Sequence, residues 1–430
     1  MLKRVLKNFA VVLRGRGIAA VFSVTSTGLM ANALSATEFG LVILLHTYIM
    51  VVRGALNFRT FETIVRFGIP LSEAGDDRGL RSLLRSTMMI DIVAALLAVI
   101  LGIAAAPLAG HFLQWDSDMV AWAAMYSLII LATANSTSNG ILRIYDRFDA
   151  LSVQFTIGPA LRFMMVSIAW VLDAPMPVFI VAWGSAFAVG HIYMTVRGLK
   201  ELKAHMNTSL WSGFQWQEIR DRQQAFWKFI GVVYWQTNID LLPKHVSTLL
   251  AGALLGPAAA GLFRLAREFS SVLTQPAVLL REVFFPDLTR SFHARDEGFH
   301  TVPWKTAFIA GAAGLVFVIL ALFIGRPILG IVGEEYVAAA PLLSLMLLAA
   351  TFELAGASLR AAVYAMGKAA SILRIHVIGI TAYVAMFFVL TPITGLIGPG
   401  LAGITSSLLV LILTGLLIKR IVRRSTAPKQ

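Results

Sequence analysis

The sequence predicts an all-α, polytopic membrane protein of about twelve transmembrane helices, arranged as two six-helix repeats around a central cavity. Three observations support this fold class. Hydrophobic residues make up 58% of the 430 positions and charged residues only 14%, whereas a soluble domain carries about 25% charged residues. Apolar stretches of about 20 residues recur along the whole chain. Short sequence blocks also reappear about 221 residues later, which indicates two halves built on one plan.

Three pairs of blocks carry the internal repeat. Segment 34–41 resembles 255–262, segment 107–110 resembles 327–330, and segment 145–150 resembles 364–369, at offsets of about 221, 220 and 219 residues. Membrane bundles that are repeated in the same direction suggest two halves that face each other across a cavity, as in transporters with repeat-related halves. The repeat therefore favours movement of a substrate over chemistry on it.

The apolar stretches give the predicted spans and domains. We predict spans at 11–34, 38–65, 84–107, 118–142, 150–172, 177–197, 226–253, 257–283, 304–326, 337–362, 371–391 and 396–419. The predicted domains are an N-terminal bundle (1–197), a cytoplasmic linker (198–225) and a C-terminal bundle (226–430). Tryptophans among polar residues in the linker are typical of an amphipathic interfacial helix, which either rests on lipid headgroups or binds a partner. The first span is expected to remain uncleaved, because no small-residue cleavage site follows its basic start.

Lys and Arg residues gather in alternate loops, which predicts the orientation. The predicted cytoplasmic segments hold nearly all of them, whereas the loops around 35–37, 110–118, 173–176, 256–258, 333–336 and 391–397 hold none, with Arg326 at the edge of one loop. We therefore expect a multi-pass protein of the bacterial inner membrane with both termini in the cytoplasm. The same distribution explains the net charge of +13 without a nucleic-acid partner.

Enzymatic and metal chemistry find little support in the sequence. The chain has no cysteine, no phosphate-binding loop of the Gly-x-x-x-x-Gly-Lys type and no Gly-x-Ser-x-Gly motif. Its eight His residues are scattered, and a lone membrane His is more often a packing residue than a ligand. We predict no enzyme activity, no catalytic residues, no metal site and no cofactor.

Ionisable residues within spans are the candidate functional residues, because their burial is costly. In span two, Arg53 is expected about 20 Å along the helix from Gly40, well inside the bilayer. Arg59, Glu62 and Arg66 share one helical face by their spacing, and Arg66 is expected at the cytoplasmic boundary.

The second half adds further charged candidates. In span seven, Asn238 and Asp240 lie beside a mid-span proline, so they form either a site for a coupling ion or, in the case of Asp240 with Lys244, a structural ion pair. In span eight, Arg264 and Glu268 are spaced for an intrahelical pair, which leaves Arg267 as the better candidate ligand. Glu353 in span ten is a further candidate for ion coupling.

The balance of these buried charges is basic, which suits an anionic substrate. Guanidinium groups match phosphate oxygens with two parallel hydrogen bonds. The predicted substrate-binding residues are Arg53, Arg59, Lys244, Arg264 and Arg267. Arg162 in span five, Arg360 in span ten and Asp91 in span three are expected to be structural.

The sequence also resembles the polysaccharide flippase family, which belongs to a superfamily with the multidrug and toxic-compound extrusion transporters and the lipid II flippases. The likeness rests on 34–41 leading into span two, Ile64 to Arg66 at its end, Gly261 to Phe263 leading into span eight, and Phe285 and Pro286 at its end. It covers almost the whole chain. The resemblance implies export of an undecaprenyl-pyrophosphate-linked oligosaccharide by alternating access, with the lipid bilayer and the polysaccharide polymerase or export machinery as further partners.

The alternative is a cation-coupled multidrug exporter of the same superfamily. Such exporters typically carry an acidic residue in span one, whereas 11–34 holds only Arg14 and Arg16 as charged residues. Lipid II flippases usually have two spans more than the twelve that are predicted here. The basic interior therefore favours the polysaccharide branch.

The predicted topology can be tested with reporter fusions. Reporters fused after Trp115 and after Leu255 should report the periplasm, and a reporter fused after Arg222 should report the cytoplasm, because an even number of spans precedes it. An external signal at Arg222 would contradict the twelve-span topology.

Overall fold

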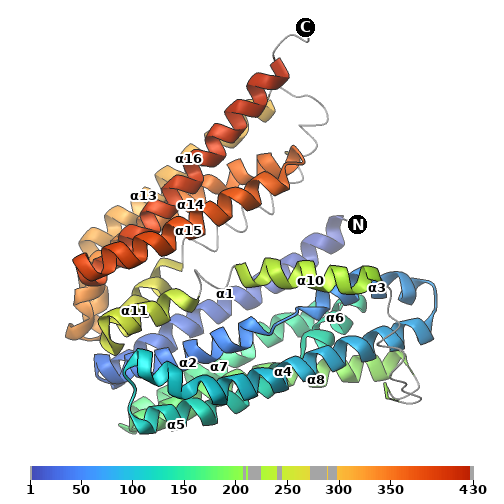
Figure 1. Ribbon diagram of the computed structural model, residues 1–430, viewed down its shortest axis with the longest axis horizontal. Coiled ribbons are helices and arrows are strands. Elements are labelled where there is room, and N and C mark those ends of the chain that lie inside the picture. The colour runs from blue at the N-terminus through green and yellow to red at the C-terminus, as the bar shows by residue number, and fades with distance from the viewer. Residues whose placement is uncertain are drawn as a thin grey trace. The chain divides into compact units, whose positions relative to one another are not determined.

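The computed structural model describes residues 2–206, 210–211, 224–239, 245–271, 288 and 298–426. These residues are mainly helical (Figure 1). The helices are α1 (Leu2–Ala33), α2 (Ala36–Ala55), α3 (Thr60–Glu73), α4 (Asp77–Leu113), α5 (Ser117–Tyr126), η1 (Ser127–Thr133), α6 (Ser136–Ile144), α7 (Phe148–Val171), α8 (Met176–His205), α10 (Gln224–Ile239), α11 (Ser247–Leu255), α13 (Gly298–Val332), η3 (Glu334–Ala339), α14 (Ala340–Ala365), α15 (Ala369–Thr394), η4 (Gly395–Ile397) and α16 (Gly398–Thr426). A further helix covers 257–271. Each predicted span overlaps a helix, so the predicted all-α, polytopic fold is confirmed.

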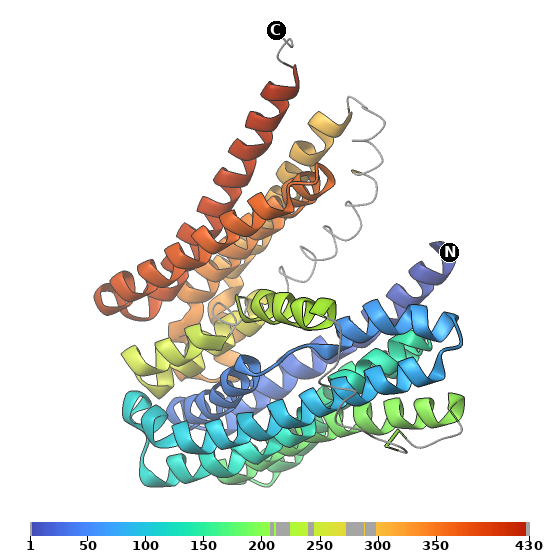
Figure 2. The same ribbon diagram turned by 45° about the vertical axis from the view of Figure 1, so that its right-hand side comes forward.

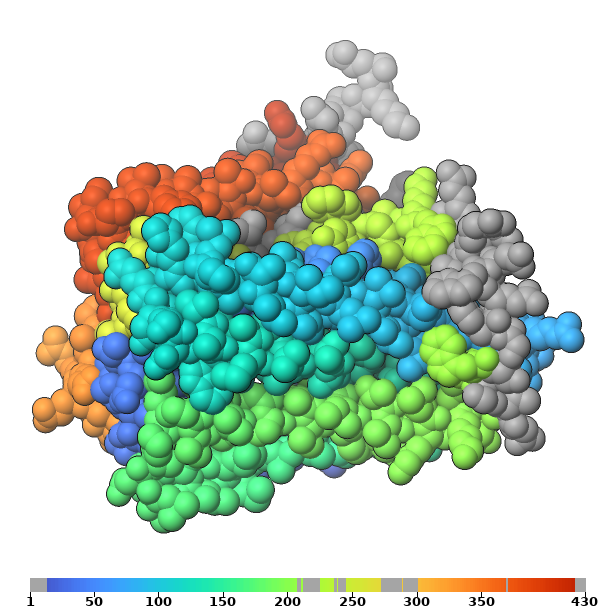
Figure 3. All heavy atoms as spheres, turned by 60° about the horizontal axis from the view of Figure 1, so that its bottom comes forward, coloured from blue at the N-terminus to red at the C-terminus, as the bar shows by residue number. Residues whose placement is uncertain are grey.

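Eight helical stretches of the described chain are long and apolar enough to cross a membrane. They are Ala36–Ala55, Asp77–Leu113, Ser117–Ile144, Phe148–Val171, Met176–His205, Thr301–Val332, Glu334–Ala365 and Ala370–Ile421. The last stretch contains both α15 and α16, which η4 separates. Large apolar side chains of α4 and α8 are exposed, and both helices lie on the face shown in Figure 3. Such a surface is suited to lipid.

The helices group into two compact units, Met1–Leu249 and Leu250–Gln430. In the N-terminal unit, α7 packs against α1 and α8, and α4 packs against α2, α3 and α5 (Figure 2). In the C-terminal unit, α14 packs against α13 and α16, and α15 packs against α16. The division falls inside the seventh predicted span, so α10 groups with the N-terminal unit. Most of the predicted linker, 198–225, lies outside the described residues.

The third pair of repeated blocks forms the same turn in both units. The backbone N–H of Arg147 donates to a carbonyl five residues earlier, and so does the backbone N–H of Lys368. The residue before each donor has a positive φ, +55° at Asp146 and +71° at Gly367. Both are therefore Schellman turns at the end of a helix. The structural offset between these turns is about 221 residues, which equals the offset of the first pair and corrects the offset of about 219 taken from the sequence.

The second predicted span is broken near its C-terminal end. Helix α2 ends at Ala55, and α3 begins only at Thr60. Arg59 has a φ of +45°, which is uncommon for a residue other than glycine, and its backbone N–H donates to Asn57 Oδ1 at 3.1 Å. The expectation of one continuous helix over 38–65 was therefore wrong.

The fourth predicted span is broken as well. The 3₁₀ segment η1 ends at Thr133, and α6 begins at Ser136. The hydroxyl of Ser136 accepts a hydrogen bond from the backbone N–H of Phe61 at 3.0 Å. Because Phe61 lies in the first turn of α3, this bond places the two helix breaks side by side.

Asp91 in α4 joins the two breaks. One of its carboxylate oxygens accepts from Thr60 Oγ1 at 2.7 Å, and the other accepts from the backbone N–H and the hydroxyl of Thr137, both at 2.7 Å. Both threonines lie in the first turn of a helix, where the helix dipole favours a negative charge. Asp91 is only 8% exposed, so one buried carboxylate fixes the points at which α3 and α6 begin.

Replacing Asp91 with Ala should strongly destabilise the N-terminal unit. The substitution removes the acceptor of three hydrogen bonds to a charged group in a buried place, so we expect the free energy of unfolding to fall by about 4 kcal/mol. Asp76 offers a matched control, because it also caps a helix but at an exposed turn. Asp76→Ala should cost about 1 kcal/mol. Equal losses for the two variants in detergent, measured by chemical denaturation, would contradict this role of Asp91.

Candidate functional site

A small cavity lies where the two broken helices meet α4. It has a volume of about 30 Å³, which is enough for about one water molecule. Its polar lining consists of Arg53, Asn57, Asp91, Thr133 and Ser136. A guanidinium and a carboxylate thus line one cavity, and no ion pair joins them within the described chain.

Arg53, in the last turn of α2, is the candidate ligand with the fewest protein partners. Its guanidinium lies 5.9 Å from the centroid of the Phe187 ring and interacts electrostatically with His191. Among the described residues, it makes no hydrogen bond or ion pair. A guanidinium has five N–H donors, and a buried charge without a counter-charge is costly. Arg53 is therefore suited to an anion that enters the protein.

A larger cavity lies between α2, α7 and α8. It has a volume of about 200 Å³ and is lined by His46, Gln154, Phe155, Gly158, Pro159, Arg162, Trp183, Ala186, Phe187, Gly190 and His191. Its polar members are basic or neutral, and none of the lining residues is acidic. A cavity with this lining favours an anionic or polar ligand over a cation.

Packed partners hold the polar groups of the larger cavity in place. Arg162 Nε donates to Ser26 Oγ at 2.9 Å, and its guanidinium lies 4.2 Å from the centroid of a Trp183 ring, as in a cation–π contact. Asn135 Nδ2 donates to His191 Nδ1 at 2.8 Å. The sequence predicts that Arg162 lies within a span. Its neighbours Ser26 and Trp183 come from α1 and α8, so no local sequence pattern could have predicted these contacts.

Arg53 links the two cavities. It lines the small cavity, and its guanidinium faces the ring of Phe187, which lines the larger one. Arg53 therefore lies beside a wall residue of the larger cavity while it lines the small one.

Three further arginines gather around two phenylalanines of the N-terminal unit. The guanidinium groups of Arg59 and Arg143 lie 5.1 and 4.9 Å from the centroid of the Phe61 ring, and that of Arg16 lies 5.1 Å from the Phe155 ring. Arg143 interacts electrostatically with Arg59, Arg16 and Glu62, and Glu62 forms an ion pair with Arg59 at 3.2 Å. Arg59 is thus partly neutralised. Arg16 and Arg143 were not predicted as site residues, because they come from separate spans.

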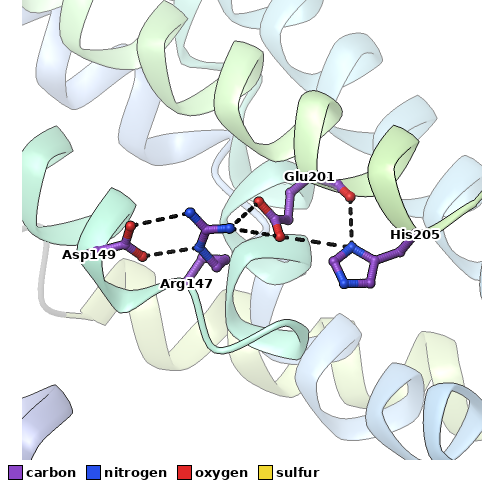
Figure 4. A network of polar contacts seen from close by, with 4 residues as sticks. All are labelled: Arg147, Asp149, Glu201 and His205. Carbon is purple, nitrogen blue, oxygen red and sulfur yellow. Dashed lines mark hydrogen bonds and ion pairs between the residues drawn. The ribbon is translucent and has the colours of Figure 1, made fainter.

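The turn between α6 and α7 is tied to α8 by a separate ionic network (Figure 4). Arg147 Nη1 donates to both carboxylate oxygens of Glu201, at 3.0 and 2.9 Å, and Arg147 Nε donates to Asp149 at 3.2 Å. The Asp149 carboxylate raises the pKa of Arg147 above its usual range, and Glu201 adds to this effect. The His205 ring stacks on Tyr145, with 3.9 Å between the centroids. These mutual contacts indicate a structural connection between helices.

The C-terminal unit holds the remaining described candidates. Arg264 forms an ion pair with Glu268 at 2.9 Å, which confirms the predicted intrahelical pair. Arg267 interacts electrostatically with Arg264, Tyr383, Glu268 and Glu353. Glu353 is exposed, and its carbonyl accepts from Arg360 Nη2 at 2.9 Å.

Span seven is described only in part. Asn238 lies near the end of α10, and its amide donates to the carbonyl of Tyr234 at 2.9 Å. Asp240 and Lys244 lie outside the described residues. The roles assigned to them from the sequence therefore stay predictions.

The repeat also relates two of the site residues. Arg267 follows Gly261 by six residues, as His46 follows Gly40. His46 lines the larger cavity of the N-terminal unit, so equivalent positions of the two repeats each carry a basic side chain. The sequence alone singled out only Arg267.

Comparisons with known proteins agree with this architecture. No protein-family profile matches the sequence. The chain is 28% identical to "Inner membrane protein YghQ" of Escherichia coli (strain K12) over 346 residues, which cover 78% of this chain and 95% of that protein.

Solved structures give the fold. The chain is similar to an inward-facing multidrug resistance MATE family transporter of the MOP superfamily, with a TM-score of 0.71, 16% identity and 96% of both chains covered. It is also similar to the lipid II flippase MurJ, with a TM-score of 0.68, 14% identity, and 93% of this chain and 86% of that chain covered. A third neighbour is a MOP superfamily transporter from Pyrococcus furiosus described as having a binding pocket of reverse polarity, with a TM-score of 0.63, 14% identity, and 97% and 96% covered. The chain therefore has the polytopic, all-α fold that these membrane transporters share.

Proposed function

We propose that the protein is a flippase that moves an undecaprenyl-pyrophosphate-linked oligosaccharide across the bacterial inner membrane for surface polysaccharide biosynthesis. The observation that carries this proposal is Arg53. A guanidinium with no hydrogen bond or ion pair in the described chain lines one cavity and faces the wall of a second, acid-free cavity. A diphosphate supplies the two-pronged oxygen acceptor that a guanidinium matches.

The comparisons support transport but leave the substrate open. MurJ is described as a lipid II flippase, and the Pyrococcus furiosus neighbour as having a pocket of reverse polarity and a different function. An interior richer in arginine than in carboxylate is in line with an anionic substrate here. The relative YghQ is named an inner membrane protein, which supports the same location for this chain, with both termini in the cytoplasm as the loop charges predict.

The proposed mechanism is alternating access between the two units. Arg53 belongs to the N-terminal unit and Arg267 to the C-terminal unit. In this proposal each guanidinium offers its unit a two-pronged donor for a phosphate group of the substrate, and access alternates between the two sides of the membrane. Arg59, Arg264 and Lys244 provide additional positive charge around the headgroup, and the lipid tail stays in the bilayer.

The second candidate function is a cation-coupled multidrug exporter. Its support is the similarity to multidrug resistance transporters of the MATE family. Asp91, together with the predicted ion-coupling residues Asn238, Asp240 and Glu353, would serve the cation in that case. The acid-free lining of the larger cavity favours the flippase, because a cationic drug would meet Arg162 and two histidines.

Deleting the gene in its host should distinguish the two functions. The flippase predicts loss of a surface polysaccharide, with its lipid-linked precursor retained in the membrane. A deletion strain with intact surface glycan and new sensitivity to cationic drugs would favour the exporter.

Substitutions at Arg53 and Arg267 test the site directly. Lysine keeps the charge but loses the planar fork, so Arg53→Lys and Arg267→Lys should lower glycan export about tenfold or more at normal folded abundance. Arg66→Lys is the matched control, because Arg66 is exposed and stacks 4.6 Å from the Phe229 ring. It should export normally.

The two alanine variants separate a ligand role from a structural one. If the arginines hold the protein together, then Arg53→Ala and Arg267→Ala should lower the amount of folded protein. Full export by both alanine variants at normal abundance would remove these residues from the mechanism.

A further inference from the structure

We propose that Asp91 is the proton-binding residue of this transporter and that an anion bound at Arg53 drives Asp91 to take up the proton. The inference rests on the proposed function, because it requires an anionic headgroup beside Arg53. It assigns the coupling ion to Asp91 of α4, whereas the candidates for ion coupling predicted from the sequence are Asn238, Asp240 and Glu353.

Asp91 is surrounded by neutral hydrogen-bond donors. All of its hydrogen bonds within the described residues come from neutral donors, namely two threonine hydroxyls and one backbone N–H. No Lys or Arg of the described chain forms an ion pair with it. Hydrogen bonds and helix termini hold this buried carboxylate, and ionisable groups of this kind inside membranes mark proton pathways.

The small cavity gives a proton access to Asp91. Arg53 and Asp91 are its charged lining residues, and the volume of about 30 Å³ admits about one water molecule. Such a water molecule can carry a proton to Asp91. A metal cation would meet the charge of Arg53 in the same small space, so the geometry favours a proton over sodium.

The position of Arg53 provides the coupling. Arg53 lines the small cavity together with Asp91, and its guanidinium lies 5.9 Å from the centroid of the Phe187 ring, a wall of the larger cavity. An anion in the larger cavity brings a second negative charge to this region, and a nearby like charge makes the neutral form of Asp91 more favourable. One O–H bond then forms on Asp91 while an O–H bond of a hydronium ion breaks and leaves a water molecule. The proton returns to the solvent when the anion leaves.

The elements around Arg53 and Asp91 carry further charged or titratable groups, and two of these groups are paired with each other. Arg59 and Glu62 of the α3 start form an ion pair. The remaining groups are Arg53 of α2, His191 of α8, which is bonded to Asn135, and Tyr234 of α10, which donates to the Ala55 carbonyl and stacks on Phe58. Asp91 is therefore the acidic residue that lines the small cavity together with Arg53.

The test measures proton uptake during ligand binding. Purified protein in weakly buffered detergent is titrated with farnesyl diphosphate between pH 6 and 8, while a pH indicator counts protons and calorimetry counts bound ligand. Wild-type protein should take up about one proton more per bound diphosphate than Asp91→Asn at the pH of maximal uptake. The Asn variant should still bind the ligand, because its amide can accept from Thr137 and donate to Thr60.

A second variant keeps the test decisive if Asp91→Asn folds poorly. Thr60→Val keeps the carboxylate but removes one hydrogen bond to its charged form, so the pH range of proton uptake should move upward. Equal proton uptake by wild-type and Asp91→Asn at equal ligand occupancy would overturn the assignment of Asp91, as would an unchanged pH range in Thr60→Val. If the wild-type protein binds no diphosphate at any pH, the proposed substrate class fails, and this coupling fails with it.

Discussion

The contact between Asp91 and two helix starts is the constraint on which the N-terminal unit depends. A break inside a membrane span exposes backbone N–H and C=O groups that lipid cannot satisfy. Here two breaks lie side by side, and one carboxylate accepts hydrogen bonds from the first turn of both following helices. The breaks end α2 just after Arg53 and open the small cavity. Asp91 therefore stabilises the two helix breaks beside which Arg53 and the small cavity lie.

The charges of the described chain fall into two groups with different consequences. Arg59, Arg147 and Arg264 each have a carboxylate within 3.2 Å, so part of their charge is neutralised by an ion pair. The guanidinium groups of Arg53 and Arg162 instead contact aromatic rings. Arg162 lines the larger cavity, whose lining residues include no acidic residue. This lining supports the proposal of an anionic ligand.

Hydrophobic length was sufficient to predict the all-α, polytopic fold from the sequence, because every predicted span overlaps a helix. The helix breaks were missed. Asn57 to Thr60 and Asn135 to Thr137 are polar clusters inside otherwise apolar stretches, and they could have been recognised as helix starts with Ser or Thr near the N-terminus. The depth of Arg53 in the bilayer, expected from its distance along the span, stays a prediction. The contacts of Asp91, Arg162 and Arg143 could not, because each joins spans that are far apart in the sequence.

We propose that the interior of this protein binds an anionic headgroup. The most direct measurement compares two amphiphiles with the same chain, farnesyl diphosphate and farnesyl trimethylammonium, for their effect on the unfolding temperature of the purified protein. Because a ligand that binds the folded state stabilises it, the diphosphate should raise the unfolding temperature in proportion to its concentration, and the ammonium compound should not. Stabilisation by the ammonium compound alone would contradict the account.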